Sequence, residues 1–202
     1  MKWIEWSQKL QSIAQNGLTY AKDKFDIERY KDIQNIAAEI ISTYSEHDFH
    51  EVQDYLRKET GYATPKIDVR GVVIQDKKIL LVKENADGKW TLPGGWADIL
   101  ESPSENVERE VYEESGYKVK AKRLLAVYDR SRHGHVPDYP NYVYKMFFLC
   151  EVIDGEARLS IETSEVNFFA LNELPELSVA RVTGKQIKRM FELRESNETD
   201  FD

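Results

Sequence analysis

Acidic side chains gather between residues 109 and 114, where Glu110 and Glu114 are four positions apart and Glu113 lies between them. Positions four apart lie one above the other on an α-helix, so these two carboxylates would share one face. Like charges at this spacing destabilise a helix by about 0.2–0.5 kcal/mol, and Arg109 relieves only part of that cost. Carboxylate oxygens suit Mg²⁺ or Mn²⁺, and Mg²⁺ is usually bound by a few carboxylates together with substrate phosphates. The pattern favours a divalent-cation site, with a solvated acidic helix end as the alternative.

A glycine-rich loop and a helix over residues 104–115 are predicted to position these carboxylates. Ser102 is a good N-cap and Pro103 suits the first helical position. Glu105 stands three residues after Ser102, which is the spacing of a capping box.

The same segment, Gly95 to Tyr117, resembles the Nudix box without a gap. It reads as glycine, five residues, Glu, seven residues, Arg-Glu, an apolar residue, any residue, Glu-Glu, any residue, glycine and a residue that is usually apolar. An aromatic residue, Tyr117, fills the last position. The resemblance to Nudix hydrolases covers about residues 62–195 and includes the sequence LPGG at Leu92–Gly95 and the segment Glu165–Leu177.

This resemblance implies an α+β fold, an α/β/α sandwich around a mixed sheet. It also implies metal-dependent hydrolysis of the P–O–P bridge of a nucleoside diphosphate linked to another moiety (NDP-X). The implied metal ligands are Glu110, Glu114, Glu113 and the Gly95 carbonyl. Arg109 would orient the glutamates, and Glu101 would shape the loop.

The attacking water also needs a general base, which in this family comes from the helix or from a later loop. Glu165 is our loop candidate and Glu162 the second, because both lie beside the predicted strand over residues 166–170. A plain surface role for both remains the alternative.

Three residues near the motif are candidates for substrate binding. Arg70 interrupts an otherwise apolar strand, which suits either a phosphate site or a position on an edge strand. Trp96 would stack on a base or pack internally. Asp98 would accept a hydrogen bond from a base or pair with a cationic group.

The residues before the Nudix-like segment follow a different pattern, in which apolar residues recur every three or four positions. This predicts three helices, the first interrupted near Asn16 and Gly17 and the second covering about residues 27–44. Three short helices bury little core alone. We therefore expect residues 1–61 to be a small helical N-terminal domain that mediates dimerisation, preceding the Nudix hydrolase domain at residues 62–202.

Strands are expected after Pro65, separated by the Nudix-like helix and followed by one more helix over residues 183–194. The terminal residues 195–202 are expected to be frayed. The predicted strands cover residues 67–75, 78–83, 121–128, 142–153 and 166–170.

Composition sets further bounds. The chain has 202 residues, 41% of them hydrophobic, and a formal net charge of -8, which exclude a largely disordered chain. The apolar runs are too short to cross a bilayer. The single cysteine, Cys150, is predicted to be a buried thiol. A cytoplasmic protein without DNA or membrane partners is expected. Six Lys and Arg residues within 118–132 form either a solvated strand edge or a phosphate-facing rim.

The helical extension resembles that of a bacterial Nudix subgroup whose members are CDP-choline or ADP-ribose pyrophosphatases. The overall layout is most similar to the CDP-choline type, with ADP-ribose as the next substrate, and implies a homodimer. One alternative is RNA processing, as an exonuclease or a 5′-pyrophosphohydrolase; the basic stretch motivates it and the acidic net charge opposes it. The other alternative is a non-hydrolytic nucleotide sensor, which the complete set of box glutamates disfavours.

Overall fold

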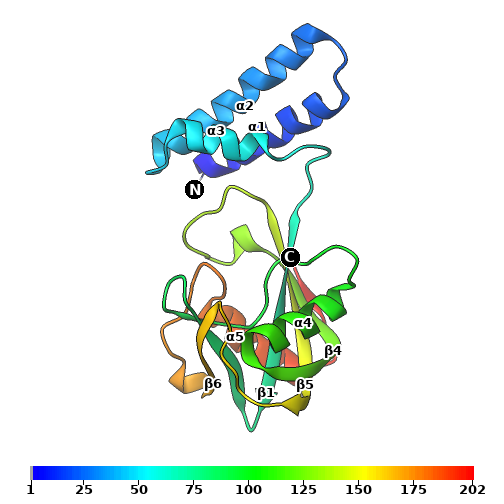
Figure 1. Ribbon diagram of the computed structural model, residues 1–202, viewed down its shortest axis with the longest axis vertical. Helices are drawn as coiled ribbons and strands as arrows, with labels where there is room; N and C mark the ends of the chain where they lie inside the picture. Colours follow the sequence, from blue (N-terminus) through cyan, green and yellow to red (C-terminus); the bar gives the residue numbers. More distant parts are fainter. Residues whose placement is uncertain (1) are drawn as a thin grey trace. The chain divides into compact units, whose positions relative to one another are not determined.

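The computed structural model describes residues 2–202, which form two compact units. The first unit runs to Pro65 and also includes Asp138–Tyr142 (Figure 1). The second unit consists of Lys66–Pro137 and Val143–Asp202. No described helix is both long and apolar enough to span a membrane.

The first unit contains three helices, α1 (Lys2–Tyr20), α2 (Lys24–Tyr44) and α3 (Phe49–Arg57). An aspartate N-cap begins each of the last two, and its side chain accepts hydrogen bonds from two backbone N–H groups of the first turn. A small apolar core joins the helices; its buried members are Ile4, Ala37, Ala38, Ile41, Val52 and Leu56.

Helix α1 continues through Asn16 and Gly17, so the predicted interruption there is wrong. A Cβ atom at Gly17 would lie 2.3 Å from the ring of Tyr30. The glycine therefore permits α2 to approach α1 closely. This packing offsets the cost of about 1 kcal/mol that a glycine carries inside a helix.

The second unit is built on a mixed seven-stranded sheet in the order β3-β2-β1-β5-β4-β7, with β6 paired to β2. Strand β1 runs parallel to β5, and β4 runs parallel to β7. The other pairings are antiparallel. The strands are β1 (Lys66–Gln75), β2 (Lys78–Glu84), β3 (Trp90–Thr91), β4 (Tyr117–Asp129), β5 (Val143–Gly155), β6 (Thr163–Ala170) and β7 (Asp200–Phe201).

Helices α4 (Pro103–Ser115) and α5 (Gly184–Glu195) belong to separate cores on this sheet (Figure 1). Val72 of β1 packs in one core with buried residues of α5, whereas Val69 and Val73 pack in the other with buried residues of α4. Side chains of a strand alternate between its two faces, so the two cores lie on opposite faces. This confirms the α/β/α sandwich with a mixed sheet. Cys150 is buried in the core on the α4 side, where desolvation raises the pKa of its thiol to about 12.

The C-terminal residues are ordered into the sheet, so the expected frayed tail is wrong. Strand β7 pairs with β4, and the Tyr128 hydroxyl donates to the Asp200 carboxylate at 2.9 Å. Arg189 of α5 also pairs with Asp200, at 2.7 Å. The sequence could not predict β7, because a strand of two residues is too short to show an alternation of polar and apolar residues. Its partners also lie far away along the chain.

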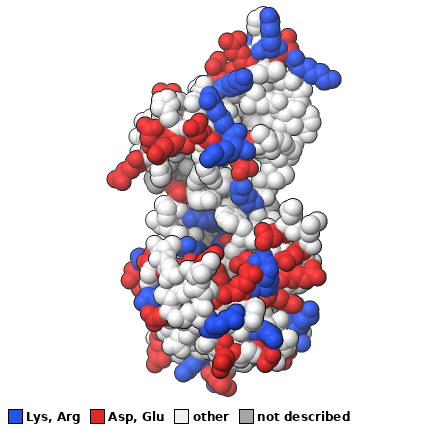
Figure 2. All heavy atoms as spheres, viewed as in Figure 1, with Lys and Arg blue, Asp and Glu red and all other residues white. Residues whose placement is uncertain are grey.

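The basic stretch over residues 118–132 is matched by protein partners. Three lysines pair with acidic side chains (Lys118 with Asp154, Lys120 with Glu108, Lys122 with Glu151), and Arg123 donates to three backbone carbonyls near the C-terminus. Figure 2 shows cationic and acidic side chains interspersed on the visible face of the second unit. This arrangement favours the solvated-strand interpretation of the stretch.

Candidate active site

The first part of the loop before α4, residues 93–97, lies against β1. The N–H groups of Val69 and Gly71 donate to the carbonyls of Gly95 and Pro93, each at 2.8 Å. Gly94 has a φ of 135°, and a Cβ atom there would lie 2.1 Å from the Val69 carbonyl oxygen. Only glycine fits at this position, which fixes the path of the loop.

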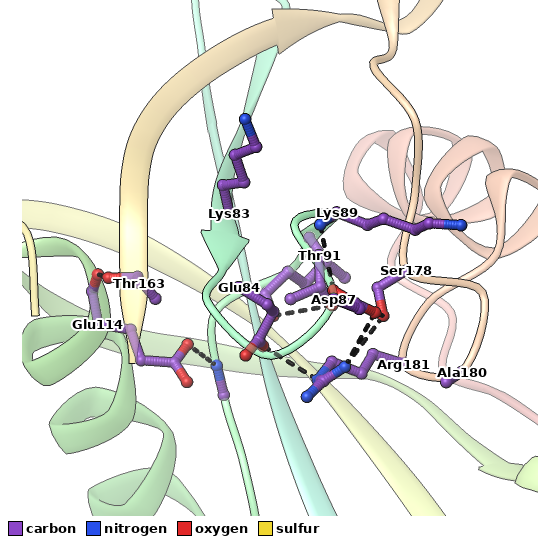
Figure 3. A network of polar contacts seen from close by, with 12 residues as sticks. Lys83, Glu84, Asp87, Lys89, Thr91, Glu114, Thr163, Ser178, Ala180 and Arg181 are labelled. Atoms are coloured by element: carbon purple, nitrogen blue, oxygen red, sulfur yellow. Dashed lines mark hydrogen bonds and ion pairs between the residues drawn. The ribbon is translucent and has the colours of Figure 1, made fainter. Parts of the chain in front are cut away.

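Helix α4 then carries the predicted glutamates to this loop. The Ser102–Glu105 capping box begins the helix as predicted, and Gly116 ends it in the left-handed conformation at a φ of 81°. Glu114 is only 5% exposed, and its Oε2 accepts a 2.8 Å hydrogen bond from the Gly94 N–H (Figure 3).

Glu110 approaches the same loop one residue further along. A Cβ atom at Gly95 would lie 3.0 Å from Glu110 Oε2, so the glycine leaves room for this carboxylate. The two glutamates therefore converge on Gly94 and Gly95, as their four-residue spacing predicts.

Burial makes ionised carboxylates costly here. Desolvation raises the pKa of Glu114 to about 8, and the negative charges of Glu84 and Glu110 add to this, while Arg70 and the Gly94 N–H oppose it. Desolvation also raises the pKa of Glu110 and of Glu84. A cation bound between these groups would offset the cost.

The oxygen donors at this loop suit a divalent cation that is bound only in part by protein. Within residues 2–202, no three His, Cys, Asp or Glu side chains converge into a complete metal site. Mg²⁺ requires no such cage, because it is usually bound by one or two carboxylates plus waters and substrate phosphates. Glu110, Glu114 and the second lone pair of the Gly95 carbonyl fit that requirement.

Arg109 organises the acidic residues around the helix. Its guanidinium contacts four carboxylates at 2.8–3.0 Å, those of Asp98, Glu101, Glu110 and Glu113. Glu113 is thus turned toward Arg109 and solvent. Arg109 also holds Asp98, which lies in the second part of the loop before α4. This arrangement fits the orienting role expected for Arg109.

Arg70 is buried and has partners on both sides of its strand. Strand β5 pairs with β1 at this position, and the loop from Pro93 to Gly95 occupies the other side, so the edge-strand alternative is wrong. The guanidinium forms two hydrogen bonds to Asp68, at 2.9 and 2.7 Å, and one to the Leu92 carbonyl at 3.0 Å. Its charge acts on Glu114, so Arg70 supports the acidic cluster.

Trp96, the third predicted substrate contact, follows Gly95 directly. Its backbone forms an isolated bridge with Asp68, and the residue is 46% exposed. Trp96 is thus a partly exposed residue of the loop that also carries Gly94 and Gly95.

The two general-base candidates lie in different surroundings. Glu165 forms a 2.7 Å ion pair with Lys83 on the exposed surface of the β2–β6 pair. Glu162 lies close enough to Glu84 for its charge to raise the pKa of that buried carboxyl. Glu162 is thus within electrostatic reach of the buried Glu84, and Glu165 is paired with a lysine.

A polar network around Glu84 was missed in the sequence (Figure 3). Arg181 bridges Glu84 and Asp87 at 3.0 and 3.3 Å, and Ser178 donates to Asp87 at 2.7 Å. The network joins the end of β2 to the loop before α5. The sequence offered one signal for this network, since Glu84 is a glutamate at the end of an apolar strand. Its partner Arg181 lies far along the chain, so the pair could not be predicted.

The stability of the metal-free protein should fall as the pH rises from 6.5 to 8, by about 1–2 kcal/mol. A carboxyl whose pKa is raised on folding stabilises the protein below its unfolded pKa, and this contribution is lost as pH rises through the folded value, here about 8 for Glu114. Urea unfolding in EDTA would measure the slope. His135 and Lys145, with pKa values lowered to about 4 and about 8, change their contributions mainly outside this window.

The variant Glu114→Gln is the control for this linkage, because it keeps the shape of the side chain and cannot ionise. Its slope should be clearly smaller than that of the wild type. Equal slopes in the two proteins would contradict the assignment of the titration to Glu114.

Comparison with known families assigns both parts of the chain. Residues 64–190 match the NUDIX domain, and residues 1–56 match the family described as "UDP-X-like, N-terminal oligomerisation domain". A Bacillus subtilis (strain 168) protein named "Putative ADP-ribose pyrophosphatase YjhB" is 44% identical over 95% of this chain and 91% of its own length. An ADP-ribose pyrophosphatase of Methanocaldococcus jannaschii is 38% identical over 61% of this chain and 72% of its own length.

Solved structures agree with these matches. A crystal structure of a UDP-X diphosphatase has a TM-score of 0.66 and 35% identity, covering 100% of this chain and 98% of the other. An ADP-ribose pyrophosphatase from Streptococcus suis 89-1591 has a TM-score of 0.63 and 41% identity, covering 69% of this chain and 100% of the other.

Proposed function

The chain belongs to the Nudix hydrolase family, in the subgroup with a helical N-terminal extension, and we propose that it hydrolyses the P–O–P bridge of a nucleoside diphosphate linked to another moiety. The observation that carries this proposal is the convergence of Glu110 and Glu114 on the Gly94–Gly95 loop, with Arg109 bonded to Glu110. That arrangement supports a pyrophosphohydrolase with a complete acidic motif.

In this proposal, Glu110, Glu114 and the Gly95 carbonyl hold Mg²⁺ or Mn²⁺, and Glu113 is an auxiliary ligand. The bound cation would neutralise charge on the leaving phosphate and lower the pKa of a bound water. Arg109 fixes the orientation of Glu110. Glu165 remains a general-base candidate, and the closeness of Glu162 to Glu84 supports Glu162 equally.

Substrate binding is proposed for the residues around the same loop. Trp96 stacks on the base or lines the entrance, since the residue is 46% exposed. Arg70 contributes positive charge near the glutamates from its buried position. Asp98 is held by Arg109 and contacts substrate only if that pair opens.

ADP-ribose is the substrate that we place first, because two relatives carry that activity in their names. UDP-linked substrates come next, on the name of the full-length structural relative. CDP-choline, which the layout of the sequence favours, stays a prediction.

A phosphate-release panel would test this function. Products of ADP-ribose, CDP-choline, UDP-sugars, dinucleoside polyphosphates and nucleoside triphosphates would be coupled to alkaline phosphatase, with Mg²⁺, Mn²⁺ or EDTA. We expect metal-dependent turnover, with kcat/KM highest for one NDP-X compound. Turnover of RNA alone, or nucleotide binding without turnover of any compound, would overturn the proposal in favour of the RNA-processing or sensor alternative.

We also propose that the helical unit forms a homodimer. Trp6, Ile13 and Tyr20 are seven positions apart on α1 and are 57%, 44% and 67% exposed. At 3.6 residues per turn they form one stripe, on the face opposite to the buried residues Ile4 and Ala14. An exposed apolar stripe is typical of an interface, and the matched family is described as an oligomerisation domain.

The double variant Trp6→Glu/Ile13→Glu should halve the mass of the protein measured by light scattering. Two buried carboxylates at the centre of an interface cost far more than they cost on a free surface. Lys58→Glu, an exposed charge change in the same unit, is the control and should leave the mass unchanged. An unaltered mass in the double variant would rule out this face as the interface.

A further inference from the structure

A buried asparagine on α4 forms hydrogen bonds through both ends of its amide. Asn106 is 1% exposed. Its Nδ2 group donates to the carbonyls of Asp98, Glu101 and Ser102 at 3.2–3.3 Å. Its Oδ1 accepts from the Asp98 N–H at 2.6 Å and from Arg109 Nη2 at 3.1 Å. One side chain therefore joins the loop before α4 to the arginine that contacts the glutamates.

The second part of this loop, residues 98–102, consists of exposed residues. Ile99 and Leu100 at its tip are 86% and 99% exposed, so apolar packing does not hold them. Leu100 also has a φ of 68°, in the left-handed region that disfavours a residue with a Cβ atom. The path of this segment therefore depends on polar contacts, and Asn106 forms four of them with its backbone.

The guanidinium of Arg109 has half of its carboxylate partners on this segment. Those partners are Asp98 and Glu101. The other two, Glu110 and Glu113, are on α4 itself. The contacts on the loop side therefore set the direction from which the guanidinium meets Glu110.

Asn106 orders these contacts more firmly than the ion pairs could alone. Ion pairs between exposed side chains contribute little, because each side chain must be held in place and water screens the charges. Asn106 is buried, and it binds the backbone of Asp98 and Glu101, from which the two carboxylates project. It also contacts the guanidinium itself. Both carboxylates are thus presented to Arg109 from a fixed backbone.

We propose that Asn106 is a positioning residue for the acidic site and acts on Glu110 through Arg109. This inference rests on the proposed function, through the cation site to which Glu110 belongs. The amide fixes the segment 98–102 and the guanidinium, and the guanidinium fixes the Glu110 carboxylate beside Gly95. Asparagine suits this role because one amide both donates to carbonyls and accepts from N–H groups.

Mn²⁺ binding to the full chain, measured by EPR without substrate, tests this role independently of hydrolysis. Asn106→Ala removes every contact of the amide and should weaken Mn²⁺ binding about 5–10-fold, since residues behind metal ligands commonly tune the affinity of the site. In the hydrolysis assay, kcat should fall about 10-fold and the Mg²⁺ concentration for half-maximal activity should rise. KM at saturating Mg²⁺ should stay close to that of the wild type.

Two further variants separate positioning from a general loss of stability. Asn106→Ser keeps a hydroxyl that can bond the carbonyl four residues earlier but reaches neither the rest of the segment nor the guanidinium. It should lose Mn²⁺ affinity with a smaller fall in Tm, and it carries the test if Asn106→Ala does not fold. Thr183→Ala removes the N-cap of α5, on the opposite face of the sheet, and should lower Tm without a change in Mn²⁺ affinity.

A double-mutant cycle tests the path through Arg109. Arg109→Ala removes the guanidinium, so adding Asn106→Ala to it should change Mn²⁺ affinity by less than about twofold, while Tm falls further. Losses of affinity that multiply in the double variant would overturn the inference. Wild-type Mn²⁺ affinity in both Asn106 variants would also overturn it, because that is the behaviour of a residue that only stabilises its loop.

The same measurements keep this inference distinct from the proposed function. A wild type that hydrolyses no NDP-X compound, but whose Mn²⁺ binding depends on Asn106 and Arg109 in this way, would refute the proposed function and retain the positioning role. Metal-dependent turnover by the wild type, with unchanged Mn²⁺ affinity in the Asn106 variants, would do the reverse. Absence of Mn²⁺ binding to the wild type would overturn the positioning role.

Discussion

Replacing Glu114 by Gln should lower kcat about 10³-fold, while the metal-free protein unfolds at the same or a higher temperature. The substitution removes a proposed metal ligand but keeps the volume of the side chain and an oxygen that can accept from the Gly94 N–H. It also removes a carboxyl whose ionisation burial disfavours, with a pKa of about 8. Steady-state kinetics at saturating Mg²⁺ and thermal unfolding in EDTA would measure the two effects.

The combination of lost activity and retained stability distinguishes a ligand from a packing residue. Glu151→Gln is the matched control, because Glu151 is an exposed carboxylate of β5 that pairs with Lys122 of β4. The activity of this variant should equal that of the wild type. Turnover of Glu114→Gln within a few fold of the wild type would disprove the metal assignment.

Changing Arg109 to Lys should lower kcat about 10–100-fold and weaken the apparent affinity for Mg²⁺. The charge is retained, but a lysine cannot reproduce a planar guanidinium that contacts four carboxylates at once. Glu110 would then lose its fixed orientation toward the Gly95 loop. Activity measured against Mg²⁺ concentration would separate the fall in kcat from the change in metal affinity.

A conservative exchange at an exposed pair provides the comparison for this experiment. Arg29 pairs with Asp26 on the surface of α2, so Arg29→Lys should leave both quantities unchanged. If Arg109→Lys retains wild-type kcat and Mg²⁺ dependence, charge alone accounts for the role of Arg109.

The parts of the site that depend on local spacing could be predicted from the sequence. Glu110 and Glu114 are neighbours because one helical turn separates them, and the Ser102–Glu105 box that begins the helix is also local. Gly17 was misread because its reason lies on another helix, where the Tyr30 ring occupies the space of a side chain.

The remaining contacts depend on the pairing of distant segments. Lys145 meets Asp68 because β5 pairs with β1 in one particular register. Glu84 meets Arg181, and His135 meets Val179, because separate loops come together over the end of the sheet. A single sequence contains the residue types for such contacts but no information on which of them pair.

The short segment Asp138–Tyr142 has a consequence for domain exchange. It is encoded between β4 and β5, yet it belongs to the helical unit, where Gln8 donates to the Tyr139 carbonyl at 2.9 Å and Asn141 donates to the Tyr55 hydroxyl. A chimera that replaced residues 2–65 alone would leave this segment facing foreign helices. The structural unit is therefore discontinuous in sequence. A helical extension taken from a relative should be transplanted together with the five residues of that relative that correspond to Asp138–Tyr142.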